Sequence, residues 1–382
     1  GRRLAPGLVQ LTGTHLQKGQ TVHTRPELPD PSPPFVAADG SVEVYGSALH
    51  YIRFQNWDVF ARGGPFELVD LDLRYPAGAM MSNVYGHPWD VLKARIRYKT
   101  STREILIAGS MSPTGGRARA RWPHDNVTRR LFAFECHDGV WTRHQRPLFG
   151  DPHSGWVGHC YGGNLYQRGC ELTGEFDFAS EDPAYLFYER VTEGDRERGP
   201  RVTELFARRL YSLERAGAEV KILGAGDPPW PSTRRTIGGT LVEGPRPVRM
   251  SAGGEEFYVL GFSSGDFPTD KYALNWAWSR EILGPYEPAL TSDGADLADL
   301  GHDVREQFHL SWTGRPVFYQ TPEGSWEMMF HGVHKAVLPE NDYKHWPERY
   351  KLWEFYRCLF KARLKVTFER GRPCLALDLH ER

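Results

Sequence analysis

Residues 243–285 read EGPRPVRMSAGGEEFYVLGFSSGDFPTDKYALNWAWSREILGP. The stretch opens on a glutamate, and a Gly-Gly turn then leads into Glu256–Phe262, where aromatic and aliphatic residues alternate. A further strand, Ala273–Trp278, follows a loop and ends at a Leu-Gly-Pro-Tyr corner. Because glycines stand where hairpins need positive φ, the pattern predicts three consecutive antiparallel strands.

The rest of the chain has the composition of a protein built from short strands and turns. Its 382 residues include 40 Gly and 28 Pro, and 13% of them are aromatic, which is typical of an all-β protein. All-β barrels and propellers reach this length as one unit. We therefore expect a single domain over residues 1–382, in which residues 1–18 form a lead-in arm or a closing strand.

Charge and cysteine content exclude several classes of partner. The formal net charge is −1 and no long apolar run occurs, so we expect neither a nucleic-acid nor a membrane partner. The five cysteines are odd in number and contain no CxxC pair, so we expect no disulfide framework, no metal site and no cofactor. No signal peptide is visible, which favours a cytoplasmic protein, but the chain starts at Gly1 without a Met, so secretion after processing is the alternative.

The opening stretch resembles the fourth blade of the five-bladed β-propeller of the family 43 glycoside hydrolases. The matching features are E-G-P at Glu243, the hairpin, and the ending S-x-x-x-x-G-P-Y at Ser279–Tyr286. Blade one of the family begins with D-P and ends a later strand with Y-G-[ST], as Asp30-Pro31 and Tyr45–Ser47 do here. The resemblance implies an all-β, five-bladed propeller in which Asp30 is the general base and Glu243 the general acid.

The second and fifth blades are also similar to the family pattern. Pro88-Trp89, ahead of the strand Val91–Tyr98, corresponds to the W-A-P that opens the second blade, so Trp89 is a candidate sugar platform. In the fifth blade, GRPVFYQTPEGSWEMMFHGVH resembles the closing blade, but Arg315 stands where the family has a channel histidine. A fixed cation there would repel a central calcium ion, and it could instead bind an anionic group of the substrate. His309 could reach the same region.

Blade three departs from the family. Its first strand in the family carries an aspartate that raises the pKa of the acid, whereas the matching position in GWVGHCYGGNLYQ is His159, with no carboxylate beside it. A neutral histidine cannot raise a neighbouring pKa by repulsion, and a protonated one lowers it. Either burial of Glu243 supplies the shift, or Asp90 or Asp125 substitutes for the aspartate, or His159 is itself an acid or base.

Three functions follow from these patterns. The first is a glycoside hydrolase-like enzyme that acts on a small glycoside or oligosaccharide with inversion, using Asp30 and Glu243. The second is a repurposed propeller of small-molecule biosynthesis that performs a cyclisation, elimination or isomerisation of a secondary metabolite with Glu243, His159 and Arg315. The third is a carbohydrate-binding protein without turnover. Trp89, Asp90, His309 and Arg315 are the candidate substrate-binding residues.

Overall fold

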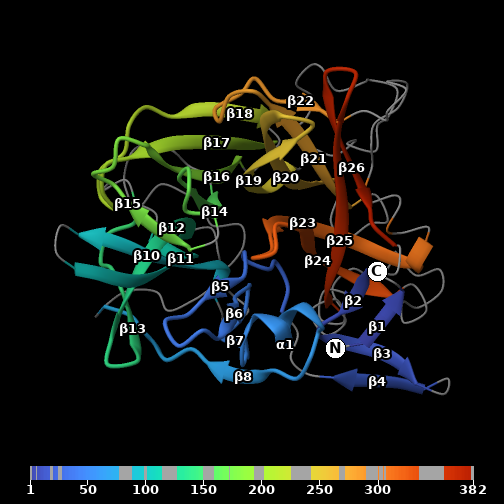
Figure 1. The fold of residues 1–382 in the computed structure, drawn as a ribbon. Helices are drawn as coiled ribbons and strands as arrows, with labels where there is room; N and C mark the ends of the chain where they lie inside the picture. Colours follow the sequence, from blue (N-terminus) through green and yellow to red (C-terminus); the bar gives the residue numbers. More distant parts are fainter. Residues whose placement is uncertain are drawn as a thin grey trace, which may run out of the picture.

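In a computed structural model, the chain forms five mainly antiparallel sheets arranged in a ring, which is a five-bladed β-propeller (Figure 1). The structure describes residues 2–5, 7–17, 20–24, 28–76, 88–98, 101–113, 127–148, 159–171, 173–192, 202–224, 242–265, 272–289, 300, 304, 307–334 and 357–379.

Each blade contains four core strands that follow one another along the chain. Blade one comprises β5 (Phe35–Val36), β6 (Val42–Val44), β7 (His50–Phe54) and β8 (Glu67–Asp70). Blade two comprises β10 (Trp89–Tyr98), β11 (Ser101–Pro113), β12 (Val127–His137) and β13 (Val140–Arg143). Blade three comprises β14 (His159–Tyr166), β16 (Ala184–Thr192), β17 (Val202–Leu210) and β18 (Val220–Gly224). Blade four comprises β19 (Val242–Ala252), β20 (Glu255–Ser264), β21 (Ala273–Ser279) and β22 (Glu287–Pro288). Blade five comprises β23 (Leu310–Gln320), β24 (Trp326–His334), β25 (Cys358–Glu369) and β26 (Arg372–Leu377).

The strands of blade four agree with those expected from the sequence. Gly253 and Gly254 have φ of 59° and 82°, so the Gly-Gly pair makes the hairpin turn between β19 and β20. β21 then pairs with β20 over Ala273–Ser279, as the alternation predicted. One strand was not expected from the sequence: β15 (Glu175–Asp177), which lies between β14 and β16 in the chain, pairs with β10 and extends blade two.

The N-terminal segment joins the last blade. β2 (Leu8–Gln10) pairs with β25, and β1 (Arg2–Ala5) pairs with β2, so strands from both ends of the chain share one sheet. A separate hairpin of β3 (Gly13–Gln17) and β4 (Gln20–Thr24) lies beside them (Figure 1). β9 (Leu73–Arg74) extends blade two, and α1 (Trp57–Ala61) connects β7 to β8. Residues 1–18 thus include strands of the closing blade.

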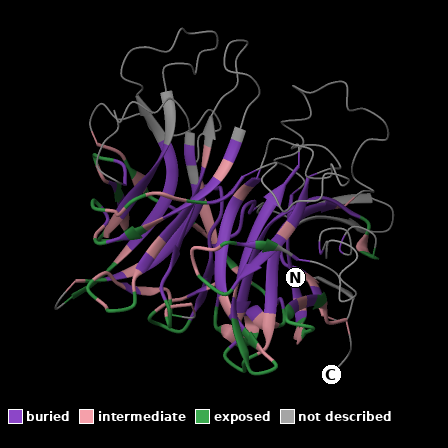
Figure 2. Ribbon diagram, turned by 90° about the horizontal axis from the view of Figure 1, so that it is seen from above, coloured by how far each residue is buried: buried purple, intermediate pink, exposed green. Residues whose placement is uncertain are grey.

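The hydrophobic core consists of the interfaces between blades. Five buried apolar clusters lie in the described part of the chain, and each combines residues from two neighbouring blades. One of them packs Val42 and Ile52 of blade one against Val317 and Met329 of blade five, which links the first blade to the last. Buried residues accordingly run along the strands, whereas exposed residues gather at the turns (Figure 2). Five interfaces of this kind are what a closed ring of five blades requires.

A buried lysine strengthens the contact between blades one and two. Lys93 Nζ lies 2.8 Å from Glu43 and 4.7 Å from the ring centroid of Phe35, and Tyr45 donates its hydroxyl to the same Glu43 carboxylate. Blade five repeats this arrangement, since Lys361 Nζ and the Tyr319 hydroxyl both contact Glu327. In both places the ion pair compensates the charges of a lysine and a glutamate that are buried among apolar residues.

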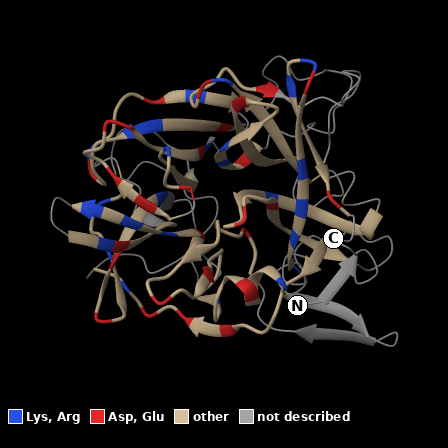
Figure 3. Cartoon of the chain, in the orientation of Figure 1, with Lys and Arg blue, Asp and Glu red and all other residues tan. Residues whose placement is uncertain are grey.

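Lys and Arg residues alternate with Asp and Glu residues along the strands and turns of the described blades (Figure 3). None of the helices in the described part of the chain has the length and hydrophobicity of a membrane span. All five cysteines are free thiols.

Candidate active site

One backbone position recurs near the start of every blade and directs side chains to the centre of the ring. Its φ is 55° at Asp30, 49° at Asp90, 67° at Gly162, 66° at Gly244 and 52° at Arg315. In β10, β14, β19 and β23 the pairing register shifts at this residue, which is the pattern of a β-bulge. Residues other than glycine adopt this conformation uncommonly, and strained backbone of this kind is frequent at functional sites.

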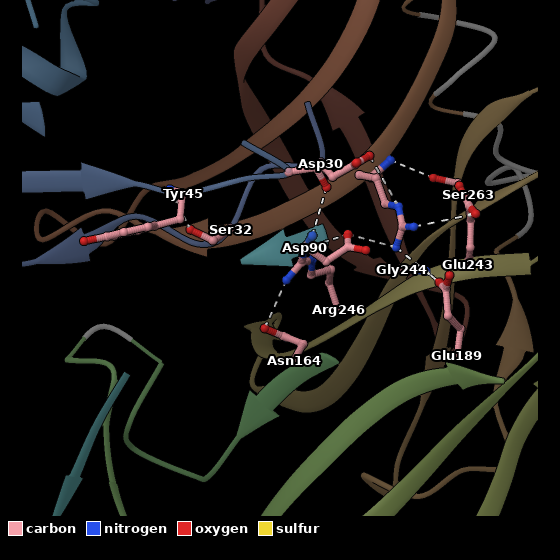
Figure 4. Close-up of polar contacts among 12 residues, drawn as sticks. Asp30, Ser32, Tyr45, Asp90, Asn164, Glu189, Glu243, Gly244, Arg246 and Ser263 are labelled. Carbon is pink, nitrogen blue, oxygen red and sulfur yellow. Dashed lines mark hydrogen bonds and ion pairs between the residues drawn. The ribbon is translucent and has the colours of Figure 1, made fainter. Parts of the chain in front are cut away.

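Arg315 contacts four carboxylates that come from four different blades, Asp30, Asp90, Glu189 and Glu243, and Figure 4 labels these four. The Arg315 guanidinium nitrogens are 3.2 Å from Glu189, 3.3 Å from Asp90, and 3.6 Å from both Asp30 and Glu243. The Arg315 side chain is only 4% exposed. Because a buried guanidinium must be paired with anions, its charge is compensated within the protein.

Two of these four carboxylates retain contact with solvent. The side chains of Asp30 and Glu243 are 12% and 13% exposed, whereas those of Asp90 and Glu189 are 1% and 0% exposed. Asp30 and Glu243 are therefore the pair that a bound molecule could reach. Asp90 and Glu189 form the floor of the cluster.

The surroundings of Asp30 keep it ionised. Arg357 Nη1 lies 3.1 Å from its carboxylate, and His331 Nδ1 accepts a hydrogen bond from its backbone N–H. Burial alone would raise the pKa of Asp30, but the positive charges of Arg357 and Arg315 outweigh burial and hold that pKa well below its usual value. Burial lowers the pKa of His331 to about 4, so this ring is neutral near pH 7. An ionised carboxylate is the form that a general base requires.

Glu243 is oriented by a phenol. The Tyr272 hydroxyl donates a hydrogen bond to Glu243 Oε1, and burial raises the pKa of Tyr272 well above 10, so the phenol remains a donor. The next residue, Gly244, donates its backbone N–H to Glu189. Glu243 is thus held by its own hydroxyl partner on one side and by the Arg315 cluster on the other.

The two floor carboxylates have raised pKa values. Burial raises the pKa of Glu189 to about 8, and the negative charges of Glu243 and Asp90 add to the shift while Arg315 opposes it. Burial also raises the pKa of Asp90 to about 6, again against the effect of Arg315. These groups therefore exchange protons between about pH 6 and pH 8, which is unusual for carboxylates.

A second arginine closes the floor beside Asp90. Arg246 is 2% exposed, its Nη2 lies 3.9 Å from Asp90, and its Nη1 donates to Asn164 at 3.3 Å (Figure 4). Burial lowers the pKa of Arg246 to about 10, so it remains cationic at neutral pH. Asp90 therefore lies between the Arg246 and Arg315 guanidiniums.

The structure brings together some of the residues singled out from the sequence but not all. Asp30, Asp90, Glu243 and Arg315 meet in one cluster. Trp89 begins β10 directly before Asp90 and is half-buried, whereas His309 is exposed at the turn before β23 and does not enter the buried cluster.

Three of the remaining expectations concern His159, Asp125 and a metal. His159 is the first residue of β14, but its side chain is outside what the structure describes, and Asp125 lies outside the described residues. In the described ranges, no three His, Cys, Asp or Glu side chains come together in a way that could hold a metal ion.

Sequence reasoning missed Glu189, Arg357, His331 and Tyr272. The expectation that blade three lacks a carboxylate at the centre was based on its first strand, and Glu189 comes from the second strand, β16. A signal for it does exist in the sequence, because Glu189 ends the otherwise apolar run Ala184–Tyr188. A charged residue in a strand that is expected to be buried indicates a paired or functional site.

No protein-family model and no curated protein matches the sequence. Solved structures do match the fold. A thermostable family-43 glycoside hydrolase aligns with a TM-score of 0.56 at 13% identity, covering 92% of this chain and 93% of that one. An α-L-arabinanase from Cellvibrio cellulosa, in complex with arabinohexaose, aligns at 0.53 and 12% identity over 93% of this chain and 96% of that one. An endo-1,4-β-xylanase from Bacteroides thetaiotaomicron aligns at 0.52 and 13% identity, covering 92% and 95%.

Proposed function

We propose, from the premise that this chain has the five-bladed propeller fold of the family 43 glycoside hydrolases, that it hydrolyses a small glycoside or oligosaccharide with inversion. In this proposal Asp30 activates water as the general base, and Glu243 protonates the leaving oxygen as the general acid. The neighbours whose names mention arabinan and xylan suggest neutral pentosides as the first substrates to test.

The observation that carries the proposal is the selective exposure of two carboxylates. Of the four acidic groups around Arg315, only Asp30 and Glu243 remain accessible. They contact different nitrogens of one guanidinium, Nε and Nη2, so their contacting oxygens are at most about 10 Å apart. Inverting glycosidases place the two carboxyl groups about 6.5–9.5 Å apart to leave room for water, which lies within that limit.

The protonation state of Asp30 fits the role of a base. Asp30 has a lowered pKa and is therefore ionised at neutral pH, as a base must be. The third carboxylate that this chemistry uses next to the acid would be Glu189, which binds the backbone N–H of Gly244 directly after Glu243. Glu189 thus supplies, from the second strand of blade three, the carboxyl group that the first strand lacks.

The test uses aryl and natural glycosides with different leaving groups. We expect wild-type protein to cleave an α-L-arabinofuranoside or a β-D-xyloside, and ¹H NMR of the first product should show the inverted anomer. Glu243→Gln should lower kcat by about 10³-fold on an oligosaccharide but less on an activated aryl glycoside, whose leaving group needs little protonation. Asp30→Asn should lower kcat on both by a similar factor, because water activation is needed for either substrate.

A control on the same blade separates chemistry from surface charge. Glu256, an exposed carboxylate paired with Arg249 and Arg168, can be changed to Gln without touching the cluster, and we expect wild-type kinetics. Full activity in Glu243→Gln on the oligosaccharide would show that the acid lies elsewhere. Binding of sugars by the wild-type protein without cleavage of any would favour a carbohydrate-binding protein instead.

A further inference from the structure

Arg315 is the only described residue that contacts all four carboxylates of the cluster, and its charge is used within the protein. The four carboxylates belong to blades one to four, while Arg315 itself belongs to blade five. At contacts of 3.2–3.6 Å in a buried site, each pair is a strong electrostatic interaction. An anionic substrate group would have to compete with these four partners, so binding such a group is not the role that this geometry favours.

Two glycines make the space that the guanidinium occupies. A Cβ on Gly244 would lie 2.3 Å from Arg315 Nη1 and 2.4 Å from its Cδ, closer than any real contact. A Cβ on Gly162 would lie 2.7 Å from Glu189 Oε2 and 3.1 Å from Arg315 Nη1. Both glycines occupy the recurrent left-handed position, which they adopt at little cost. The missing side chains of blades three and four therefore leave room for Arg315 and for Glu189.

The backbone of Arg315 is fixed as firmly as its side chain. Its φ is 52°, a conformation that costs an L-residue roughly 1–2 kcal/mol, and its N–H donates to the buried Ser263 Oγ at 2.6 Å. Its backbone N–H is bonded to Ser263 and its guanidinium contacts four carboxylates, so the residue cannot easily turn towards a ligand. The strain is consistent with a fixed position rather than with a mobile one.

We propose that Arg315 is a positioning residue, an internal cation seated in the space left by Gly162 and Gly244, which holds Asp30 and Glu243 against the neighbouring Nε and Nη2 atoms of one guanidinium. The roles of Asp30 and Glu243 as base and acid rest on the proposed function, whereas the seat of Arg315 does not. The cation lowers the pKa of Asp30 and, with Arg357, keeps the base ionised. Displacing it should therefore change both the rate and the pH dependence.

The sharpest test displaces Arg315 without altering any charge. Gly244→Ala would put a methyl group into the guanidinium, whereas Gly253→Ala adds the same methyl group at nearly the same φ, 59° against 66°, in the turn at the other end of β19. At Gly253 the nearest atom would be Phe368 Cβ at 3.6 Å, an ordinary contact. The two variants thus share the cost of an alanine at positive φ and differ in the crowding of Arg315.

We expect Gly244→Ala to lower kcat by about 10²-fold and to move the acidic limb of the kcat/KM profile upward by about one pH unit, because Asp30 loses part of its stabilising cation. Gly253→Ala should leave kcat and the limb as in wild-type protein. Arg315→Lys, which keeps the charge but loses the planar fork, should move the limb in the same direction as Gly244→Ala. Equal kinetics for the two glycine variants, or an unmoved limb in both Gly244→Ala and Arg315→Lys, would overturn the proposal.

A second readout needs no substrate, so failure of the proposed function leaves the test intact. In urea unfolding, Gly244→Ala should be less stable than Gly253→Ala, and this difference should be larger at pH 9 than at pH 5. At pH 5 Asp90 and Glu189 carry protons and need the cation less. If the difference between the two variants is the same at both pH values, Arg315 does not serve as the internal cation. If wild-type protein cleaves no glycoside and this pH-dependent difference is present, the positioning role stands and the hydrolase proposal fails.

Discussion

Replacing Glu189 by Gln should remove part of the pH dependence of the free energy of unfolding. Glu189 is fully buried on β16, and burial raises its pKa to about 8 from an ordinary value near 4.5. A carboxyl whose pKa is raised on folding stabilises the folded protein at pH values below its unfolded pKa, and that contribution is lost as the pH rises through its folded pKa. Wild-type protein should therefore lose stability between about pH 4.5 and pH 8 on account of this one group.

The loss of stability follows from the difference between the folded pKa of Glu189, about 8, and its ordinary value near 4.5. This difference corresponds to at most about 5 kcal/mol, because one pKa unit is worth about 1.4 kcal/mol. We expect a change of about 2–5 kcal/mol; the pKa of about 8 already includes the Arg315 and Gly244 contacts, which favour the ionised form. Gln cannot ionise, but its amide oxygen can still accept from the N–H of Gly244. Relative to wild-type protein, Glu189→Gln should thus gain about 2–5 kcal/mol of stability between pH 5 and pH 9.

Urea unfolding followed by tryptophan fluorescence at pH values from 5 to 9 measures this difference directly. Glu204→Gln is the matched control, because Glu204 lies on the adjacent strand β17 and is paired with Lys221 at 2.8 Å outside the cluster. Its stability should follow the wild-type pH profile. A Glu189→Gln profile parallel to wild type, with a constant offset from pH 5 to pH 9, would refute the reasoning that Glu189 is a buried, protonated carboxyl.

Two further substitutions test the blade contacts and the orientation of Glu243. Lys93→Met should destabilise the fold by about 3 kcal/mol in urea unfolding, because it leaves Glu43 buried without its cation; a loss below about 1 kcal/mol would show that the pair is dispensable. Tyr272→Phe removes the hydroxyl that donates to Glu243 and should lower kcat on a cleaved glycoside by about 10-fold with little change in KM, as steady-state kinetics can measure; unchanged kcat would mean that Tyr272 does not orient the acid.

The fold was largely predictable because its signals are local. The Gly-Gly turn and the alternating runs around it predicted the β19–β20 hairpin and the strand β21 of blade four. Asp138-Gly139 likewise forms the turn between β12 and β13. Hairpin turns of this kind depend on a few neighbouring residues, so the sequence alone specifies them. The pairing of β15 with β10 depends on residues far apart in the chain, and no local pattern could reveal it.

The candidate site was predictable only where a single strand carried the information. Asp30 and Glu243 stand in short motifs at strand starts, and the structure brings both to Arg315. Arg315 was expected to bind an anionic substrate group, but its four carboxylate partners come from four blades, and no local pattern reports such a convergence. The same applies to Arg357 and His331, which reach Asp30 across more than 300 residues of sequence.

The recurrent left-handed position explains why Glu189 escaped a search of first strands. At this position the five blades carry Asp, Asp, Gly, Gly and Arg, so two of the five side chains that would point to the centre are absent. The volume that they leave is filled from elsewhere, by the Arg315 guanidinium and by a carboxylate from β16. Chemistry at the centre of such a ring is therefore determined by which positions are empty as well as by which are charged. In blade three, Gly162 leaves this position empty, and the group that fills the space is Glu189, a glutamate among apolar residues of the second strand.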